Sequence, residues 1–297
     1  MTSPLRILLV GGHPADAFDN AGGTLCHHVR RGDQVTCLVL TQGARVHDEV
    51  ISGAMRRRER VPEAEELERL MRERAEVKRG EVLQACAILE ISDIRFLEYD
   101  DAVLTVSEPL VLEVARVMRE VRPHVVITSW PGEGGGYGDQ HATTAQITLH
   151  AISAAAGVFP GDPNPPHNVA QVFFMAIPSC CARTSVWDAA GGYYADVIVD
   201  VSDVVERKLA ALNCIKSQAY DGAYARKCTE VAESVFGFFA PGVHTAYAEA
   251  FIRRSAETHH VLPVTERALE WAELTERERF EKYCWLVGDE GKGGRGH

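Results

Sequence analysis

Short apolar runs alternate with helical patterns along most of this chain, and this alternation constrains the fold more than any other feature. Residues 5–10 and 34–41 are apolar runs bounded by glycines, as is typical of parallel strands covered on both faces. Between them, residues 21–31 have helical spacing and end at Gly32. This segment therefore predicts a βαβ unit.

The same alternation continues beyond this first unit. Further strands are expected at residues 93–99, 124–130, 169–177 and 195–201, and helices at 109–121 and 204–218. Residues 56–90 are highly charged but keep apolar residues at helical spacing, which indicates a helix with a solvated face. We expect an α/β fold in a single domain, with a mostly parallel, doubly wound, Rossmann-like sheet. The domain is predicted to span residues 1–285, followed by a disordered tail at 286–297.

Composition and net charge limit the kinds of molecule that this chain is expected to bind. The net charge of −11 argues against a nucleic-acid-binding protein, because phosphate backbones need a basic surface. No apolar stretch approaches the roughly 20 residues of a membrane span, and no signal peptide is readable. The 8 cysteines have no CxxC spacing, which favours reduced thiols and a cytoplasmic protein. We expect a small-molecule substrate and leave a homo-oligomer open.

Three residues with metal-binding side chains follow predicted strands. His13 and Asp16 come after the first strand, and His141 comes after the fourth. Ligands of open α/β sheets bind beyond the carboxyl ends of the strands. Two imidazoles and one carboxylate there would hold Zn²⁺ with one position left for water. The alternative is that none of the three binds a metal ion. His13 would then cap a turn, Asp16 would cap the start of a helix and His141 would be an ordinary loop residue. The glycines of 11–23 form neither GxGxxG nor GxxxxGK[ST], so a nucleotide loop is not indicated.

Several motifs carry a resemblance to a known family. In order, they are "GGHPAD" at 11–16, "AGGTL" at 21–25, "TQGARV" at 41–46, "KRGEVL" at 78–83, "DQHATTAQ" at 139–146 and "AYAEAF" at 246–251. Together they resemble the LmbE/PIG-L superfamily of zinc-dependent deacetylases over about residues 5–252. The resemblance implies that His13, Asp16 and His141 are zinc ligands. It also implies that the position of Ala15 normally carries the carboxylate that takes a proton from water.

The chain departs from the family pattern at this position and at others. Ala15, Ala17 and Ala44 stand where the family often has acidic residues, and the last ligand follows Gly138, Asp139 and Gln140 instead of His-Pro-Asp. Three explanations follow: a metal-binding pseudoenzyme, a deacetylase with a relocated base, or a different reaction on the same metal. The base could be relocated to one of four residues: Asp139, Asp19, His47 or Glu49.

Among these explanations, the sequence favours a different reaction. The ring-cleavage hydratases of the superfamily, notably 4-oxalomesaconate hydratase, resemble this chain in having Ala-Asp after the His-x pair and a following Ala-Gly-Gly. Such an enzyme would hydrate an unsaturated keto-carboxylic acid, with the metal polarising the carbonyl or delivering hydroxide. The deacetylase of an N-acetyl sugar or similar small amide is the alternative.

Further residues are assigned on the hydratase interpretation. An anionic substrate needs cationic anchors, for which the candidates are Arg45, Arg79, Arg183 and Arg226. The catalytic candidates are His244, Asp139 and Tyr137, with His244 preferred as the acid. Glu249 is expected to anchor a helix or to support the metal ligands.

Overall fold

A computed structural model describes residues 3–56, 62–136, 138–176, 195–239, 245–284 and 286–288. Its centre is a seven-stranded sheet with the strand order β3-β2-β1-β4-β5-β7-β6. The strands are β1 (Arg6–Gly11), β2 (Gln34–Thr41), β3 (Asp93–Tyr99), β4 (Val125–Thr128), β5 (Gln171–Ala176), β6 (Val197–Asp200) and β7 (Ala248–Arg253). The first five strands are parallel to one another, whereas β7 runs antiparallel to both β5 and β6. The predicted α/β class with a mostly parallel, doubly wound sheet is confirmed.

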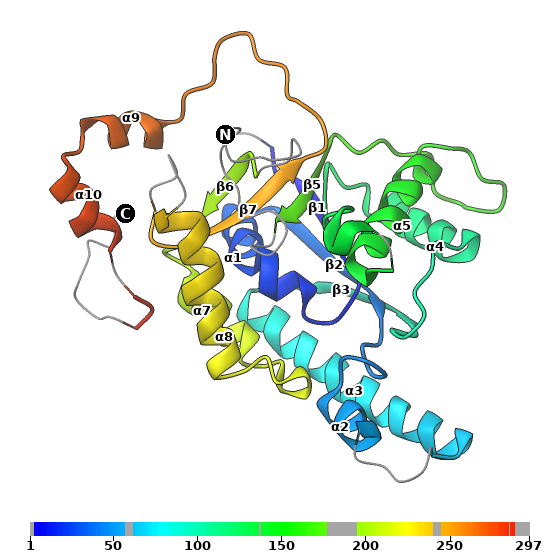
Figure 1. Ribbon diagram of the computed structural model, residues 1–297. Coiled ribbons are helices and arrows are strands. Elements are labelled where there is room, and N and C mark those ends of the chain that lie inside the picture. Colours follow the sequence, from blue (N-terminus) through cyan, green and yellow to red (C-terminus); the bar gives the residue numbers. More distant parts are fainter. Residues whose placement is uncertain are drawn as a thin grey trace.

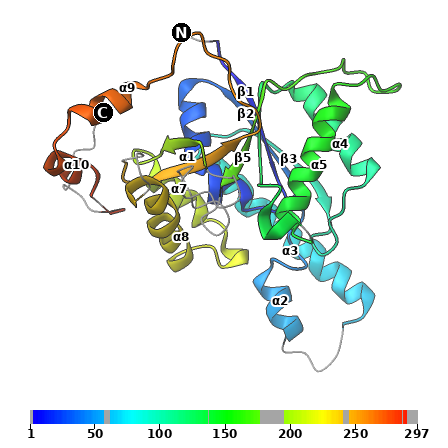
Figure 2. The ribbon, with the colours of Figure 1, turned by 45° about the horizontal axis from the view of Figure 1, so that its top comes forward.

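Helices cover both faces of this sheet (Figures 1 and 2). One face packs against α1 (Asp16–Arg31), α3 (Ala64–Ile88) and α7 (Val205–Leu212), and the other against α4 (Glu108–Val121) and α5 (Gln140–Ala155). Successive residues of a strand point to opposite faces. Ile7 and Leu9 of β1 therefore join the first core, whereas Leu8 and Val10 join the second. All four are buried, so β1 lies at the centre of the molecule.

Shorter helical elements complete the chain. They are α2 (Glu49–Arg56), η1 (Glu133–Gly136), η2 (Lys216–Gln218), α8 (Ala223–Cys228), η3 (Thr229–Glu233), η4 (Val235–Phe239), α9 (Glu266–Glu273) and α10 (Glu276–Tyr283). The last two lie beside the sheet after an extended segment (Figures 1 and 2), where Phe280 contacts Phe238 at 6.2 Å between ring centroids. Residues 289–297, most of the predicted tail, lie outside the described residues.

No helix among the described residues has the length and apolar character needed to cross a membrane.

Several predicted elements differ from the observed ones. The first helix begins at Asp16 instead of residue 21, and Asp16 and Asp19 place two acidic side chains in its first turn, where the helix dipole favours them. The predicted helix at 204–218 ends at Leu212, and η2 follows as a separate turn. Strand β7 was not predicted. Its segment is buried throughout between two strands, so it lacks the alternation of buried and exposed residues that marks an edge strand.

Candidate metal centre

The topology brings the ends of β1 and β4 together where the winding of the sheet reverses. From β1 the chain passes to β2 on one side, whereas β4 lies on the other side of β1. A crevice forms beyond the carboxyl ends of two such strands. The segment after β1 carries His13 and begins α1 at Asp16, and the loop after β4 leads through η1 into α5, which carries His141. A Cβ at Gly12 would lie 2.5 Å from Thr144 Oγ1 of α5, so glycine permits this close approach.

Asp16 is held with one carboxylate oxygen bound and the other free. Its Oδ2 atom accepts hydrogen bonds from the backbone N–H groups of Gly12 (2.7 Å) and His13 (3.0 Å). Its Oδ1 atom lies 3.6 Å from His13 Nδ1 and 3.5 Å from His141 Nε2. The free oxygen therefore faces both imidazoles.

Each imidazole is oriented through its other ring nitrogen. His141 Nδ1 lies 2.7 Å from Glu133 Oε1, and His13 Nε2 is hydrogen-bonded to Gln140 Oε1. Neither acceptor oxygen carries a hydrogen, so both of these ring nitrogens donate. The atoms His13 Nδ1 and His141 Nε2 are thereby left facing Asp16, which is the arrangement that carboxylate and amide partners give to metal-binding histidines.

The three free atoms fit a divalent metal ion. They lie within 4.8 Å of one another, and His13 and Asp16 are buried while His141 is partly buried. Ligands about 2.1 Å from a tetrahedral Zn²⁺ lie about 3.4 Å apart, close to the observed separations. Glu133, Asp139 and His141 form a second group of ligand-type atoms within 4.8 Å of one another, but His141 Nδ1 there is engaged with Glu133.

The electrostatics of this group favour positive charge. Burial alone would raise the pKa of Asp16, but the imidazoles of His141 and His13 hold it well below its usual value. Burial opposes a charged His141, yet Asp16 and Glu133 raise its pKa to about 11. This group of side chains therefore attracts a cation, either as a proton or as a metal ion.

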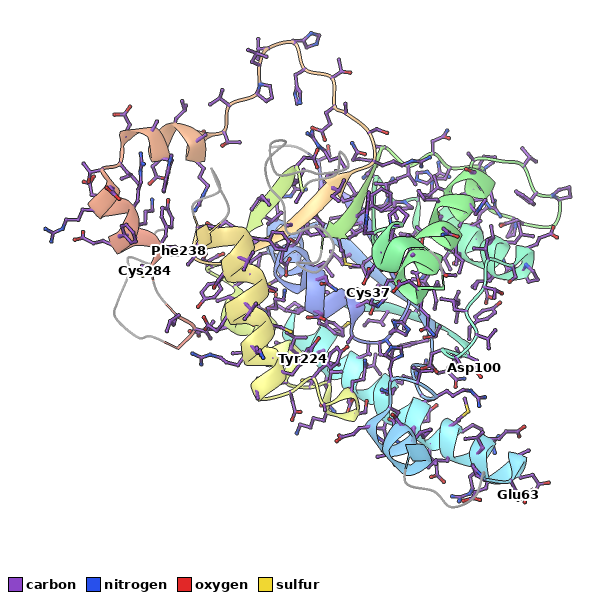
Figure 3. The ribbon with its side chains drawn as sticks, in the orientation of Figure 1. Cys37, Glu63, Asp100, Tyr224, Phe238 and Cys284 are labelled. Carbon is purple, nitrogen blue, oxygen red and sulfur yellow. The ribbon has the colours of Figure 1, made fainter. Side chains whose placement is uncertain are left out.

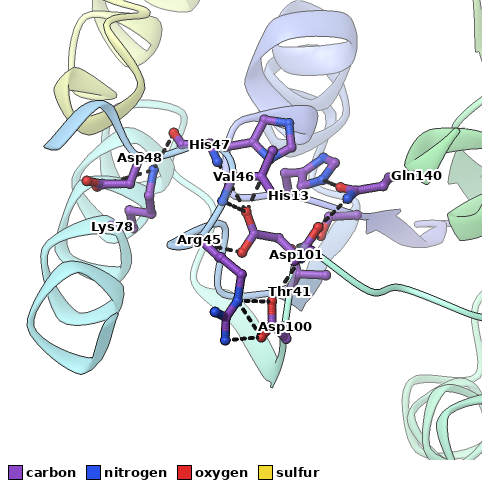
Figure 4. Close-up of polar contacts among 12 residues, drawn as sticks. His13, Thr41, Arg45, Val46, His47, Asp48, Lys78, Asp100, Asp101 and Gln140 are labelled. Atoms are coloured by element: carbon purple, nitrogen blue, oxygen red, sulfur yellow. Dashed lines mark hydrogen bonds and ion pairs between the residues drawn. The ribbon is translucent and has the colours of Figure 1, made fainter. Parts of the chain in front are cut away.

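A second polar network lies beside His13 (Figure 4). The ring of His47 is 4.0 Å from the ring of His13 between centroids, and His47 Nδ1 is 3.3 Å from Asp101 Oδ2. Asp101 is fully buried and also accepts hydrogen bonds from the backbone N–H groups of Arg45 and Val46. Burial would raise the pKa of Asp101, but these hydrogen bonds, with that of His47, keep it below its usual value. Gln140 Nε2 donates to the Asp101 carbonyl and so joins the two networks.

The other predicted catalytic residues are placed less directly. Asp139 caps α5, because its Oδ1 accepts a hydrogen bond from Ala142 N at 2.9 Å. Its assignment as a catalytic residue remains a prediction. Tyr137 and His244 lie outside the described residues.

The predicted cationic anchors are bound to carboxylates of the chain itself. Arg45 pairs with Asp100, and Arg79 pairs with Glu98. Arg226 pairs with Glu230 one helical turn away. Arg183 lies outside the described residues. None of the three described arginines is therefore presented as an unpaired cation, and their assignment as substrate anchors stays a prediction.

Two further carboxylates make hydrogen bonds at α1. Asp19 lies one turn after Asp16 and accepts a hydrogen bond from Tyr224 Oη at 3.2 Å; Tyr224 is labelled in Figure 3. Glu249 accepts hydrogen bonds from Gly23 N (2.8 Å) and Thr24 N (2.7 Å), so it anchors the middle of α1.

The sequence patterns predict no role for Glu133 or Asp101, and Gln140 stands out in them only as a departure from the family pattern. Glu133 and Gln140 both lie within eight residues of His141, and Asp101 follows β3 at the same edge of the sheet as His13. Their position just beyond the carboxyl ends of β3 and β4 is the feature from which a place at the site could have been predicted.

Comparison with known proteins shows which family this chain resembles. A family model described as PIG-L, GlcNAc-PI de-N-acetylase, matches residues 8–152, which include all three candidate ligands. A 1D-myo-inositol 2-acetamido-2-deoxy-alpha-D-glucopyranoside deacetylase of Geodermatophilus obscurus is 31% identical over 252 residues, covering 76% of this chain and 80% of that protein.

Solved structures share the fold. The 4-carboxy-2-hydroxymuconate hydratase of Pseudomonas putida KT2440 matches with a TM-score of 0.66 at 18% identity, covering 86% of this chain and 99% of that one. The N,N'-diacetylchitobiose deacetylase of Pyrococcus horikoshii matches with a TM-score of 0.61 at 19% identity, covering 84% of each chain. At such identities the likeness concerns the fold alone.

The preference for a hydratase is wrong. Relatives at 31, 25 and 28% identity all bear the name of the same sugar deacetylase, whereas the hydratase resembles this chain only in fold. The Ala-Asp pair after Pro14 was too short a motif to define a reaction. Ala15 shows that the family's carboxylate is missing at this position, but it does not show which reaction the chain catalyses. From its motifs, its fold and its similarity to these deacetylases, the chain belongs to the PIG-L family.

Proposed function

We propose that this protein is a Zn²⁺-dependent deacetylase that hydrolyses the N-acetyl group of an amino sugar or a similar small amide. The observation that carries the proposal is the convergence of His13 Nδ1, Asp16 Oδ1 and His141 Nε2, each left free while its companion atom is bound. The names of the relative from Geodermatophilus obscurus and of the Pyrococcus horikoshii structure both contain an N-acetylated amino sugar. That shared group is the one we assign to the substrate.

The three residues would hold the metal, and their neighbours would keep them in place. A zinc ion bound by three protein ligands supplies a Lewis acid and lowers the pKa of water. Glu133 and Gln140 accept hydrogens from the far nitrogens of His141 and His13, so His141 Nε2 and His13 Nδ1 point inward, where a metal ion would take the place of a proton. The N–H groups of Gly12 and His13 prevent Asp16 Oδ2 from turning into the site.

The first test is amide hydrolysis by the purified protein. Release of free amine is measured from N-acetylglucosamine, N,N'-diacetylchitobiose and N-acetylglucosaminyl-inositol, with Zn²⁺ added and after chelation. We expect Zn²⁺-dependent release from at least one of these sugars. A protein that binds zinc but leaves every N-acetyl group intact would contradict the proposal.

Substitution of the ligands tests the site itself. Asp16→Asn and His141→Ala each remove one of three protein ligands, so both variants should lose bound zinc and amine release together. Metal content is measured by elemental analysis after gel filtration. Asp203→Asn is the matched control, because it removes an exposed carboxylate that pairs with Arg30. Full zinc occupancy in Asp16→Asn and His141→Ala would refute the ligand assignment.

A further inference from the structure

We infer that His47, oriented by Asp101, accepts the proton of the attacking water during amide hydrolysis. The inference rests on the proposed function and adds a catalytic residue to it.

The proposed reaction needs a proton acceptor beside the metal ligands. Ala15, which precedes Asp16, offers only a buried methyl group. Glu133 is engaged with His141 Nδ1, and Asp139 accepts the N–H of Ala142 at the start of α5. Both carboxylates therefore have other partners. The imidazole of His47 lies against that of His13 and takes part in none of these contacts.

The position of His47 suits the role. Its ring centroid is 4.0 Å from that of His13, with an angle of 46° between the ring planes. His141 lies on His13 as well, at 5.2 Å between centroids. His13 thus contacts both a candidate metal ligand and His47. The side chain of His47 is 31% exposed, so water and substrate can reach it.

Asp101 sets the tautomer of His47. Its Oδ2 atom lies 3.3 Å from His47 Nδ1, and a carboxylate there favours a hydrogen on Nδ1. The lone pair is then on Nε2, the nitrogen that Asp101 does not contact. General-base catalysis uses this arrangement, in which a carboxylate orients an imidazole and the imidazole accepts a proton from the reacting group.

The backbone around His47 is held on both sides. Asp101 accepts hydrogen bonds from the N–H groups of Arg45 (2.8 Å) and Val46 (2.7 Å), while buried Lys78 donates through Nζ to the His47 carbonyl at 3.1 Å (Figure 4). Asp48 Oδ2 lies 3.8 Å from Lys78 Nζ and 2.9 Å from Arg74 Nε. A loop with this many buried contacts places the imidazole in a defined position, as proton transfer requires.

The proton balance of the reaction is simple. Water adds its oxygen to the amide carbonyl carbon, and its proton passes to His47 Nε2. When the C–N bond breaks, its electron pair stays on nitrogen and takes that proton from Nε2, which returns His47 to its starting form. The products are the amine and the carboxylic acid, which ionise in solution.

The test compares two substitutions of His47. His47→Phe keeps an aromatic ring against His13 but has no ring nitrogen, and His47→Ala removes the ring. Both should lower kcat about 10²- to 10⁴-fold, the usual contribution of general-base catalysis, while KM and zinc content stay at the wild-type values. His150→Phe, at an exposed position of α5, is the matched control and should keep the wild-type kcat.

Added imidazole separates proton transfer from packing. It should raise the kcat of His47→Ala at least about tenfold, because a small base can occupy the vacated space, and it should not restore Asp16→Asn. A His47→Phe variant with the kcat of the wild type, or a zinc-loaded His47→Ala variant that imidazole leaves unchanged, overturns the assignment. A zinc-loaded wild type that hydrolyses no amide would instead refute the proposed function, and this inference with it.

Discussion

At the scale of single residues, the candidate centre depends on partners that bind the far side of each ligand. Glu133 accepts the Nδ1 hydrogen of His141, and Gln140 accepts the Nε2 hydrogen of His13. Without them each imidazole could rotate or change tautomer, and its lone pair would leave the site. Loss of such partners typically weakens metal binding 10- to 100-fold, by about one to three kcal/mol.

Glu133→Ala tests this dependence. We expect the Kd for Zn²⁺ to rise about 10- to 100-fold, because His141 loses the acceptor that fixes its tautomer. The Kd is measured by competition with a chromophoric chelator. Glu120→Ala, which removes a carboxylate paired with Arg95, should leave the Kd unchanged. An unchanged Kd in Glu133→Ala would mean that the carboxylate does not orient the imidazole.

The sequence predicted His13, Asp16 and His141 as one site because each follows a strand, and strand ends meet at one edge of a parallel sheet. Their partners could not be predicted in the same way. Gln140 acts on His13, 127 positions away, and Asp101 acts on His47 from the loop after another strand. Such contacts depend on loop conformations that hydrophobic periodicity does not encode.

At the scale of elements, α1 is anchored by a buried ionic cluster. Lys208 of α7 lies 2.9 Å from Glu249 of β7 and 2.5 Å from Glu233 of η3, and all three side chains are buried. Glu249 also accepts two N–H groups of α1, whereas Glu233 Oε2 has no hydrogen-bond partner among the described residues. One cation between two carboxylates leaves an excess negative charge. Burial, which outweighs the attraction of Lys208, raises the pKa of Glu233 to about 7.

This cluster predicts a pH dependence of stability. The pKa of Glu233 rises from 4.5 to about 7 on folding, so its protonated form stabilises the fold fully below pH 4.5, and that contribution is lost as the pH rises through about 7. Glu233→Gln removes the excess charge. We expect its free energy of unfolding at pH 8 to exceed that of the wild type by about 1–3 kcal/mol, with little difference at pH 4.

Urea denaturation of both proteins across this pH range measures the effect. Glu76→Gln, at an exposed position of α3, is the control and should follow the wild type. If Glu233→Gln is less stable than the wild type at pH 8, the charged form of Glu233 stabilises the fold and the explanation fails.

At the scale of the whole molecule, most of the sheet and most of its covering helices could be predicted from periodicity. Strands buried on both faces, such as β1 and β2, give continuous apolar runs with glycines beside them. Strand β7 and the division between α7 and η2 could not, because both depend on how distant segments pack. The antiparallel β7 matters for the site, since it carries Glu249 and thereby supports the helix that begins at Asp16.

In the proposed function, one metal ion at His13, Asp16 and His141 supports amide hydrolysis. The most direct measurement is a titration of metal-free protein with Zn²⁺, in which amine release from an N-acetyl sugar and bound zinc are followed together. We expect activity to rise in proportion to bound zinc up to one ion per chain, and we expect Asp16→Asn neither to bind the ion nor to gain activity. Activity that is complete without zinc, or that rises equally in Asp16→Asn, would contradict it.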